Sequence, residues 1–307
     1  MNSPSLSFPP LRWGRIVRLT VFALAALLIA ADVAAAWVFT TALVYPGCPE
    51  ARPLPGVPAP ERVQLEAADG VRVEAWYYPS QNRAAVIALG GQGGALGEAL
   101  PPVRPLVEAG FGVLQIGSRS CAGEAVTLGY READDAAAGL AFLQSRPEVA
   151  EARIGVFGFS MGGVAAIRAA ARNPEIAAVV AEGGFYNLGE DFVEPGERKS
   201  PPRTLFLYTL AGTFWLRTGA NPWQISPVED IARLSPRPVL LIYGENEAES
   251  GRARAQFEAA GQPKELWIVP GGDHGRNHLV AGPEYERRVL AFFSRTLGGE
   301  GNRHCSP

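Results

Sequence analysis

A serine framed by glycines stands where an expected strand meets an expected helix. Residues 158–162 read Gly-Phe-Ser-Met-Gly, between a strand-like run at 153–157 and a helical stretch at 164–171. This G-x-S-x-G pattern is typical of a nucleophilic serine on a sharp strand-to-helix turn. The amides that open the following helix would point at a developing oxyanion. Ser160 is therefore the candidate nucleophile, and a glycine-rich helix start that merely packs on its strand is the alternative.

The base that such a serine needs must be one of only three histidines. His304 lies in a glycine-rich tail, and the other two follow the last expected strand. His274 stands directly at the end of that strand, where a loop can aim its side chain inward. We predict that His274 is the base and that His278 is incidental.

A glycine-rich loop at residues 90–94 follows the strand-like run 84–89 and contains Gln92. A phosphate-binding loop is the alternative, but both the G-K-[ST] sequence and the G-x-G-x-x-G spacing with a later acid are missing. Beside a nucleophilic serine, a loop of this kind supplies an oxyanion-hole amide. The backbone amide of Gln92 is the candidate donor.

The elements that must position these residues alternate along the chain. Residues 62–67 and 71–78 alternate apolar and polar positions around a turn, which predicts an antiparallel hairpin. Short apolar runs then alternate with helical stretches, which predicts an α/β fold with a mostly parallel sheet covered by helices on both faces. The expected strands are 84–89, 112–116, 153–157, 176–181, 238–243 and 265–269, and the expected helices are 132–145, 164–171, 252–260 and 285–297.

The first 61 residues differ from the rest. Residues 1–18 carry three arginines and no acid, so we expect them to stay in the cytoplasm. Residues 19–46 are almost wholly apolar and long enough to span a bilayer, which needs about 20 residues. Asp32 opposes this, because a carboxylate inside a spanning helix costs about 2.5–3.5 kcal/mol. Residues 47–61 are proline-rich and are expected to form a stiff linker.

An uncleaved transmembrane anchor and a cleaved signal peptide both fit residues 19–46, with Ala34-Ala35-Ala36 as the cleavage site in the second case. The first gives a single-pass membrane protein with its catalytic domain outside the cytoplasm, and the second gives a secreted or periplasmic protein. A buried hairpin of a soluble protein is the remaining alternative. Under either leading interpretation, we expect that removing residues 1–50 leaves an active soluble domain.

Residues 189–230 interrupt the alternation within the domain at 62–298. They are rich in proline and polar residues, yet they contain the apolar stretch 204–216. A lid would lie at this point of the chain, and a core helix that closes the sheet edge is the alternative. Residues 299–307, with His304 and Cys305, are expected to form a disordered tail.

The three cysteines show neither metal-ligand spacing nor a disulfide framework. A bond between Cys48 and Cys305 would require export. We expect Cys121 to be a structural thiol rather than a nucleophile, since no histidine lies near it in the sequence. The net charge of −3 indicates no nucleic-acid partner, and the sequence leaves the oligomeric state unknown.

These motifs together resemble the α/β-hydrolase fold, specifically its membrane-anchored serine-hydrolase branch with serine-aminopeptidase-like members. The resemblance covers residues 62–297 and rests on segments 90–94, 158–163, 235–245 and 269–274. It implies that Ser160 is the nucleophile and His274 the base. It also implies that the amides of Met161 and Gln92 form the oxyanion hole, and that no metal or organic cofactor is needed.

Two positions depart from the pattern of these relatives. Gly90-Gly91 stands where relatives usually carry His-Gly, so this loop is expected to be held differently. Where relatives place an aspartate after the glycine that ends the acid strand, this chain has Glu247, which is one methylene longer. Glu247 is the predicted triad acid. Glu245, expected to stay tied to the strand end, and Glu249 are its competitors.

Such a triad would cleave an ester or amide bond by forming an acyl-enzyme, which water then hydrolyses. We predict a serine hydrolase of small-molecule esters, of the carboxylesterase or lipase-like kind. A peptidase or thioesterase of the same fold is one alternative. A catalytically silent module used for binding is another.

Overall fold

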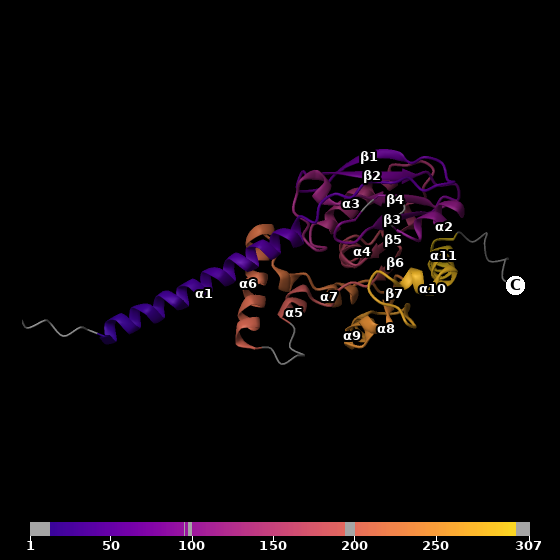
Figure 1. Ribbon diagram of the computed structural model, residues 1–307. Helices are drawn as coiled ribbons and strands as arrows, with labels where there is room; N and C mark the ends of the chain where they lie inside the picture. The colour runs from indigo at the N-terminus through magenta and orange to yellow at the C-terminus, as the bar shows by residue number, and fades with distance from the viewer. Residues whose placement is uncertain (1–12, 95, 98–99, 194–199, 299–307) are drawn as a thin grey trace, which may run out of the picture.

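The computed structural model describes residues 13–94, 96–97, 100–193 and 200–298. Its centre is one eight-stranded sheet in the order β1-β2-β4-β3-β5-β6-β7-β8 (Figure 1). β2 runs antiparallel to both β1 and β4, and all other neighbours are parallel. The strands are β1 (Glu61–Glu66), β2 (Arg72–Tyr78), β3 (Ala85–Leu89), β4 (Gly112–Ile116), β5 (Ile154–Phe159), β6 (Ala178–Glu182), β7 (Val239–Gly244) and β8 (Lys264–Val269). The predicted hairpin and mostly parallel sheet are confirmed.

Central strands are apolar on both faces because helices cover both sides of the sheet. β3, β4 and β6 bury every residue, whereas the edge strand β1 buries only Leu65. On one face the core is closed by α3 (Glu132–Gln144), α4 (Met161–Arg172), α7 (Pro227–Ile231) and α9 (Arg252–Ala259). On the other face it is closed by α2 (Val103–Glu108) and α11 (Pro283–Leu297). Two short helices, α8 (Glu245–Ala248) and α10 (Asn277–Ala281), follow β7 and β8.

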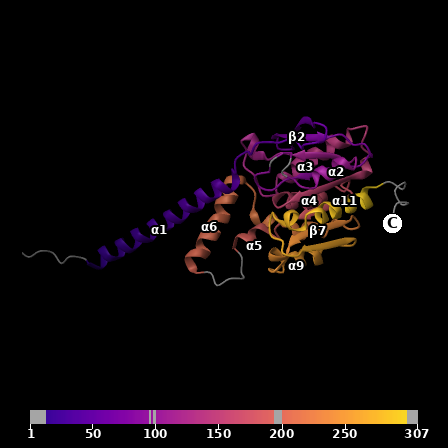
Figure 2. The ribbon, with the colours of Figure 1, turned by 45° about the vertical axis from the view of Figure 1, so that its right-hand side comes forward.

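The N-terminal helix α1 (Trp13–Val44) extends away from this domain (Figures 1 and 2). At 1.5 Å per residue its 32 residues are about 48 Å long. Only Ala36, Thr40 and Val44 are buried, all in its last three turns. Within the described ranges, α1 is the helix that is long and apolar enough to cross a membrane.

The segment that follows α1 lies against the domain instead of hanging free. Arg52 forms a parallel bridge with Gly97, and Leu54 is buried in the core below α2. The Arg104 guanidinium donates to the carbonyl of Pro55. The proline-rich stretch therefore continues the fold and does not separate α1 from it.

Cys48 forms a disulfide with Cys121, 73 residues later. The expectation that these cysteines form no disulfide, and that Cys121 stays a thiol, is therefore wrong. The physical reason is that the end of α1 rests on the loop after β4, where Ser120 donates to the carbonyl of Gly47. Sequence spacing does not reveal that long-range contact. Cys305 lies outside the described residues, as does the other tail residue singled out above, His304.

The insertion at 189–230 forms α5 (Leu188–Val193), α6 (Pro201–Thr218), a 3-10 turn at Pro222–Gln224 and α7. The long helix α6 packs against α1, α5 and the 3-10 turn. Phe214 of α6 is fully buried and meets the ring of Phe192 edge-on at 5.6 Å. One side of the apolar stretch, with Phe214, therefore packs α6 against α5 and the end of α1.

Candidate active site

Ser160 occupies the turn between β5 and α4 in a conformation that side chains rarely adopt, with φ 54° and ψ −118°. The turn needs small neighbours. A Cβ on Gly158 would lie 1.9 Å from the carbonyl oxygen of Gly162, and one on Gly162 would lie 2.3 Å from that of Leu89. The strained backbone persists because the surrounding sheet and helix hold it in place, and it presents the hydroxyl at the carboxyl end of β5.

His274 reaches this hydroxyl from the loop after β8. Its Nε2 lies 3.0 Å from Oγ of Ser160, and its ring lies beside that of Phe159 with the centroids 5.3 Å apart. The imidazole is about half exposed, so a substrate carbonyl has access to the pair. His278 lies elsewhere, in α10, with its ring 6.2 Å from that of Tyr285.

Glu247 stands behind the imidazole. Its Oε1 lies 2.8 Å from Nδ1 of His274, and its Oε2 accepts from the amide of Gly244 at 2.8 Å. The hydrogen bond and charge of this carboxylate raise the pKa of His274 above its ordinary 6.5, against a smaller opposing effect of burial. Nδ1–H thus donates to Glu247, and Nε2 of the neutral ring is free to accept the serine proton.

The two competing acids lie apart from this chain of hydrogen bonds. The Oε2 atom of Glu245 accepts from the amide of Gly271 at 2.7 Å, which ties Glu245 to the end of β8. Glu249 directly follows α8 and is exposed. Of the three glutamates, Glu247 is the one brought against His274.

The two expected oxyanion donors lie in the two chain segments next to Ser160. Met161 is the first residue of α4, so its N–H has no acceptor within the helix and is available to a ligand. Gln92 lies in the loop after β3, and the space next to Gly91 of this loop is bounded by Cβ of Ser160. The Gln92 side chain donates to the carbonyl of Leu43 near the end of α1. This contact, which the sequence does not predict, shows how a loop that lacks the usual His-Gly is held.

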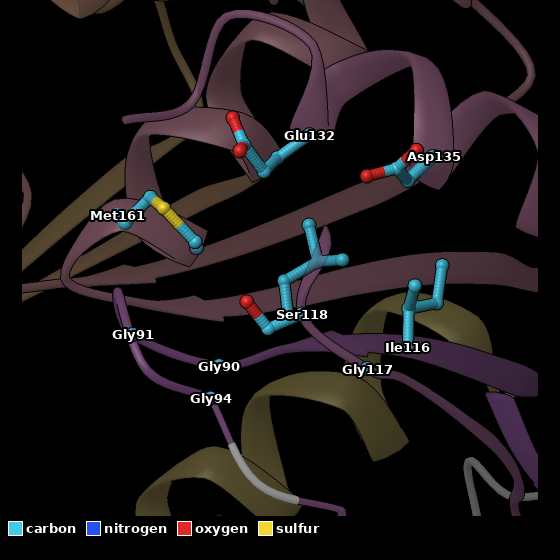
Figure 3. Close-up of a pocket in the computed structure, with 11 residues that line it drawn as sticks. Gly90, Gly91, Gly94, Ile116, Gly117, Ser118, Glu132, Asp135 and Met161 are labelled. Carbon is cyan, nitrogen blue, oxygen red and sulfur yellow. The ribbon is translucent and has the colours of Figure 1, made fainter. Parts of the chain in front are cut away.

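A small cavity lies behind the loop that follows β3 (Figure 3). Glu132 and Asp135 face it from α3, with Ser118 and Met161 also at its wall. Its volume is about 20 Å³, which suits a single water rather than a substrate or an organic cofactor. Burial raises the pKa of Asp135 to about 7, although hydrogen bonds from Arg119 oppose the rise. No group of three or more His, Cys, Asp or Glu within the described ranges is placed to hold a metal ion.

The buried carboxylate of Glu182, which the sequence analysis did not identify, forms hydrogen bonds next to the site. Glu182 ends β6, and its backbone carbonyl accepts from the amide of Ser160 at 2.7 Å. Its side chain accepts from Asn277 at 3.0 Å and from the Tyr285 hydroxyl at 2.5 Å. Burial raises its pKa. Glu182 therefore links the serine turn to the chain segment that follows His274. In the sequence, the only indication of such a role is that a charged residue directly follows an apolar run.

The chain matches a known protein family and several relatives. The model of the prolyl oligopeptidase family matches residues 125–300, which is more than half of the chain. The uncharacterized protein Rv2307c of Mycobacterium tuberculosis is 27% identical over 289 residues, covering 91% of this chain and 95% of its own.

Solved structures show the same fold. The Pyrococcus furiosus esterase Pf2001 aligns with a TM-score of 0.60 at 23% identity, over 82% of this chain and 100% of its own. A Mycobacterium tuberculosis puromycin-hydrolyzing peptidase aligns with a TM-score of 0.59 at 21% identity, over 78% of this chain and 40% of its own. The expected α/β-hydrolase fold is thereby confirmed.

Proposed function

The chain belongs to the prolyl oligopeptidase family and is a serine hydrolase of the α/β-hydrolase fold; from that premise we propose that it cleaves carboxylic esters with Ser160, His274 and Glu247 as its triad. The observation that carries the proposal is the unbroken chain of contacts from Oγ to Nε2 at 3.0 Å and from Nδ1 to Oε1 at 2.8 Å. A binding module without catalysis has no need of a strained serine in such a chain.

The mechanism follows from these atoms. Nε2 of His274 takes the hydroxyl proton as Oγ of Ser160 attacks the carbonyl carbon, and Glu247 stabilises the imidazolium that forms. The amides of Met161 and Gln92 bind the oxyanion, each lowering the barrier by about 3–4 kcal/mol. The imidazolium then gives its proton to the leaving alkoxide, and the alcohol departs. Water, deprotonated by the same imidazole, releases the acid and restores Ser160.

An ester is the substrate we favour, since an esterase is among the proteins of the same fold. A peptidase is the second candidate, and the family's name and the puromycin-hydrolyzing peptidase both favour it. An amine is a poorer leaving group than an alkoxide, so a peptidase depends more strongly on the proton that the imidazolium gives to the leaving group. A panel of p-nitrophenyl esters of increasing acyl length, run beside aminoacyl p-nitroanilides, separates the two. Faster turnover of the anilides at equal concentration would replace esterase with peptidase.

A fluorophosphonate probe tests whether the serine is a nucleophile at all. We expect the folded protein to be labelled on Ser160, and the Ser160→Ala variant to remain unlabelled. Intact mass spectrometry with peptide mapping identifies the site. A folded wild-type protein that stays unlabelled would point to a silent binding module.

For the N-terminal segment we propose an uncleaved anchor, with the catalytic domain outside the cytoplasm. The apolar length of α1 and the burial of Ala36, at the end of the cleavage site considered above, support this. The Cys48–Cys121 disulfide favours an oxidising compartment. The protein should sediment with membranes and resist carbonate extraction. A mature N-terminus at Trp37, found by mass spectrometry, would replace the anchor with a signal peptide.

A further inference from the structure

Helix α6 carries large apolar side chains on its outer face. Leu205, Tyr208, Trp215 and Leu216 are 51%, 54%, 51% and 77% exposed. Positions 205, 208, 212, 215 and 216 follow the three- and four-residue spacing of one helical face, and Gly212 in the middle leaves it open. A contiguous exposed apolar face of this kind marks a contact site rather than an ordinary surface.

The composition of this face indicates lipid as the occupant. Residues 204–216 contain no charged side chain, and Arg203 and Arg217 bracket them. Tyrosine and tryptophan are the residues that gather where a membrane meets water, because each pairs an apolar ring with a polar group. Protein-binding surfaces usually add a polar rim with charged partners, and the charge-free run along α6 offers none.

The opposite face of α6 joins it to the helix that is long enough to span a bilayer. Thr213 shares a buried hydrogen bond of 2.7 Å with Thr40 of α1. The ring of Phe206 lies 6.3 Å from that of Phe39. The Arg217 guanidinium lies over the ring of Trp37, 4.3 Å from its centroid. These contacts run from the second turn of α6 to its last turn.

The length of α1 sets where those contacts lie relative to a bilayer. A span of about 20 residues that begins after Arg18 ends near residue 38, so Trp37, Phe39 and Thr40 lie at the outer boundary. In both ribbon views the N-terminal end of α6 points to the same side as the free length of α1 (Figures 1 and 2). Packing against α1 therefore brings the exposed face of α6 to the membrane surface.

We propose that α6 lies in the outer leaflet beside α1, with Leu205 and Leu216 among the acyl chains and Tyr208 and Trp215 near the headgroups. This second membrane contact rests on the anchor proposed above. It makes the insertion a membrane-binding element and holds the catalytic domain at the bilayer by two helices.

Site-specific fluorescence in the full-length protein tests the proposal. Single cysteines are introduced by Leu216→Cys on α6, Leu28→Cys on α1 and Leu279→Cys on α10, each in a Cys305→Ser background. They are labelled with nitrobenzoxadiazole without reductant, so that the Cys48–Cys121 bond stays intact. The proteins are then reconstituted in phosphatidylcholine vesicles with and without doxyl-labelled phosphatidylcholine. Leu279 is the matched control, since it is 67% exposed but lies across the domain from α1 (Figure 1).

We expect doxyl lipid to remove most of the emission at positions 28 and 216 and to leave position 279 unchanged. Quenching at 28 without quenching at 216 overturns the α6 proposal while the anchor stands. A blue-shifted but unquenched label at 216 also overturns it, because a second protein copy then covers the face. Absence of quenching at 28 overturns the anchor itself, and quenching at 216 in that case shows that α6 binds lipid by itself.

Discussion

The catalytic loops and the α1–α6 pair are both assembled from distant parts of the chain, but different forces hold them. In the loops, Ser160, His274 and Glu247 meet through contacts of 3.0 and 2.8 Å, and the imidazole stays half exposed. In the pair, Phe214 and Val44 are fully buried, and polar contacts are secondary. The two regions touch at Met161 and at Gln92, which contact the cluster and the helix end of the pair. Substitutions of the triad should therefore act mainly on turnover, and substitutions in the pair mainly on stability.

The largest effect is expected from Ser160→Ala. Activity should fall by about six orders of magnitude, as for loss of a serine nucleophile in other triads. The melting temperature should hardly change, because the lost hydroxyl contributes nothing to the core. Turnover and thermal unfolding are measured on the same preparation. Residual activity above about a thousandth of wild type would indicate another nucleophile.

His274 and His278, the two histidines within the described residues, offer a matched pair. His274→Ala should be about as damaging as loss of the serine, since the base and nucleophile act as a unit. His278→Ala should cost less than about tenfold, or about 1.4 kcal/mol of barrier, because this ring only lies against Tyr285. Comparable losses in kcat for the two variants would remove His274 from its proposed role.

Glu247→Gln should lower turnover by about four orders of magnitude, because the amide leaves the imidazole in the wrong tautomer. Glu245→Gln and Glu249→Gln are the controls, each with an expected loss below about tenfold. Measuring kcat for all three variants side by side identifies the acid. If Glu245→Gln shows the large loss instead, Glu245 is the triad acid, and the hydrolase assignment still holds.

The Cys48–Cys121 disulfide, at the end of α1, tests the α1–α6 pair. Cys48→Ser should lower the free energy of unfolding by about 2–5 kcal/mol, with kcat on a soluble ester changed by less than about tenfold. Cys305→Ser is the control and should change neither quantity. Urea unfolding followed by tryptophan fluorescence gives the stability. An unchanged midpoint for Cys48→Ser would show that the bond adds nothing.

The contacts at the end of α1 argue against the expectation that a domain lacking residues 1–50 is soluble and active. Such a deletion removes Val44 from a buried cluster and Cys48 from its disulfide. It also exposes the face of α6 that packs on α1. The truncated protein should aggregate, and gel filtration of the purified fragment checks this.

The smallest effect is a shift in pH dependence. Because Glu247 raises the pKa of His274 above 6.5, protonation that disables the base begins at a higher pH than for an ordinary histidine. The rate should fall on the acid side of a midpoint above 6.5, by about tenfold for each further pH unit. A profile of kcat/KM that stays flat from about pH 5 to 8 would argue against a histidine base.

The two regions also differ in how far the sequence predicts them. Apolar runs predict the parallel strands well, and β4 coincides with the expected 112–116, because burial on both faces leaves a continuous signal in the chain. The serine motif marks Ser160 and the scarcity of histidines marks His274, and the structure brings His274 into contact with both Ser160 and Glu247.

The packing of α1 on α6, the Cys48–Cys121 bond and the buried Glu182 did not follow from the sequence. Each depends on contacts between residues 73 or more positions apart, and no local period or spacing encodes them. An apolar run such as 204–216 indicates that its surface must be covered, but the sequence does not show which element covers it. Only the folded chain shows that α1 covers one side of it.

The short connection between α1 and the domain has a consequence for how substrates are met. Val44 ends the helix and its carbonyl accepts from the amide of Val126, and four residues later Cys48 is bonded to the loop after β4. Under the anchor proposed above, an enzyme fixed this way would not swing on a tether but would move by lateral diffusion with Ser160 held at a constant height. For a substrate that partitions into the bilayer, the depth of the scissile bond would then govern cleavage together with its chemical structure.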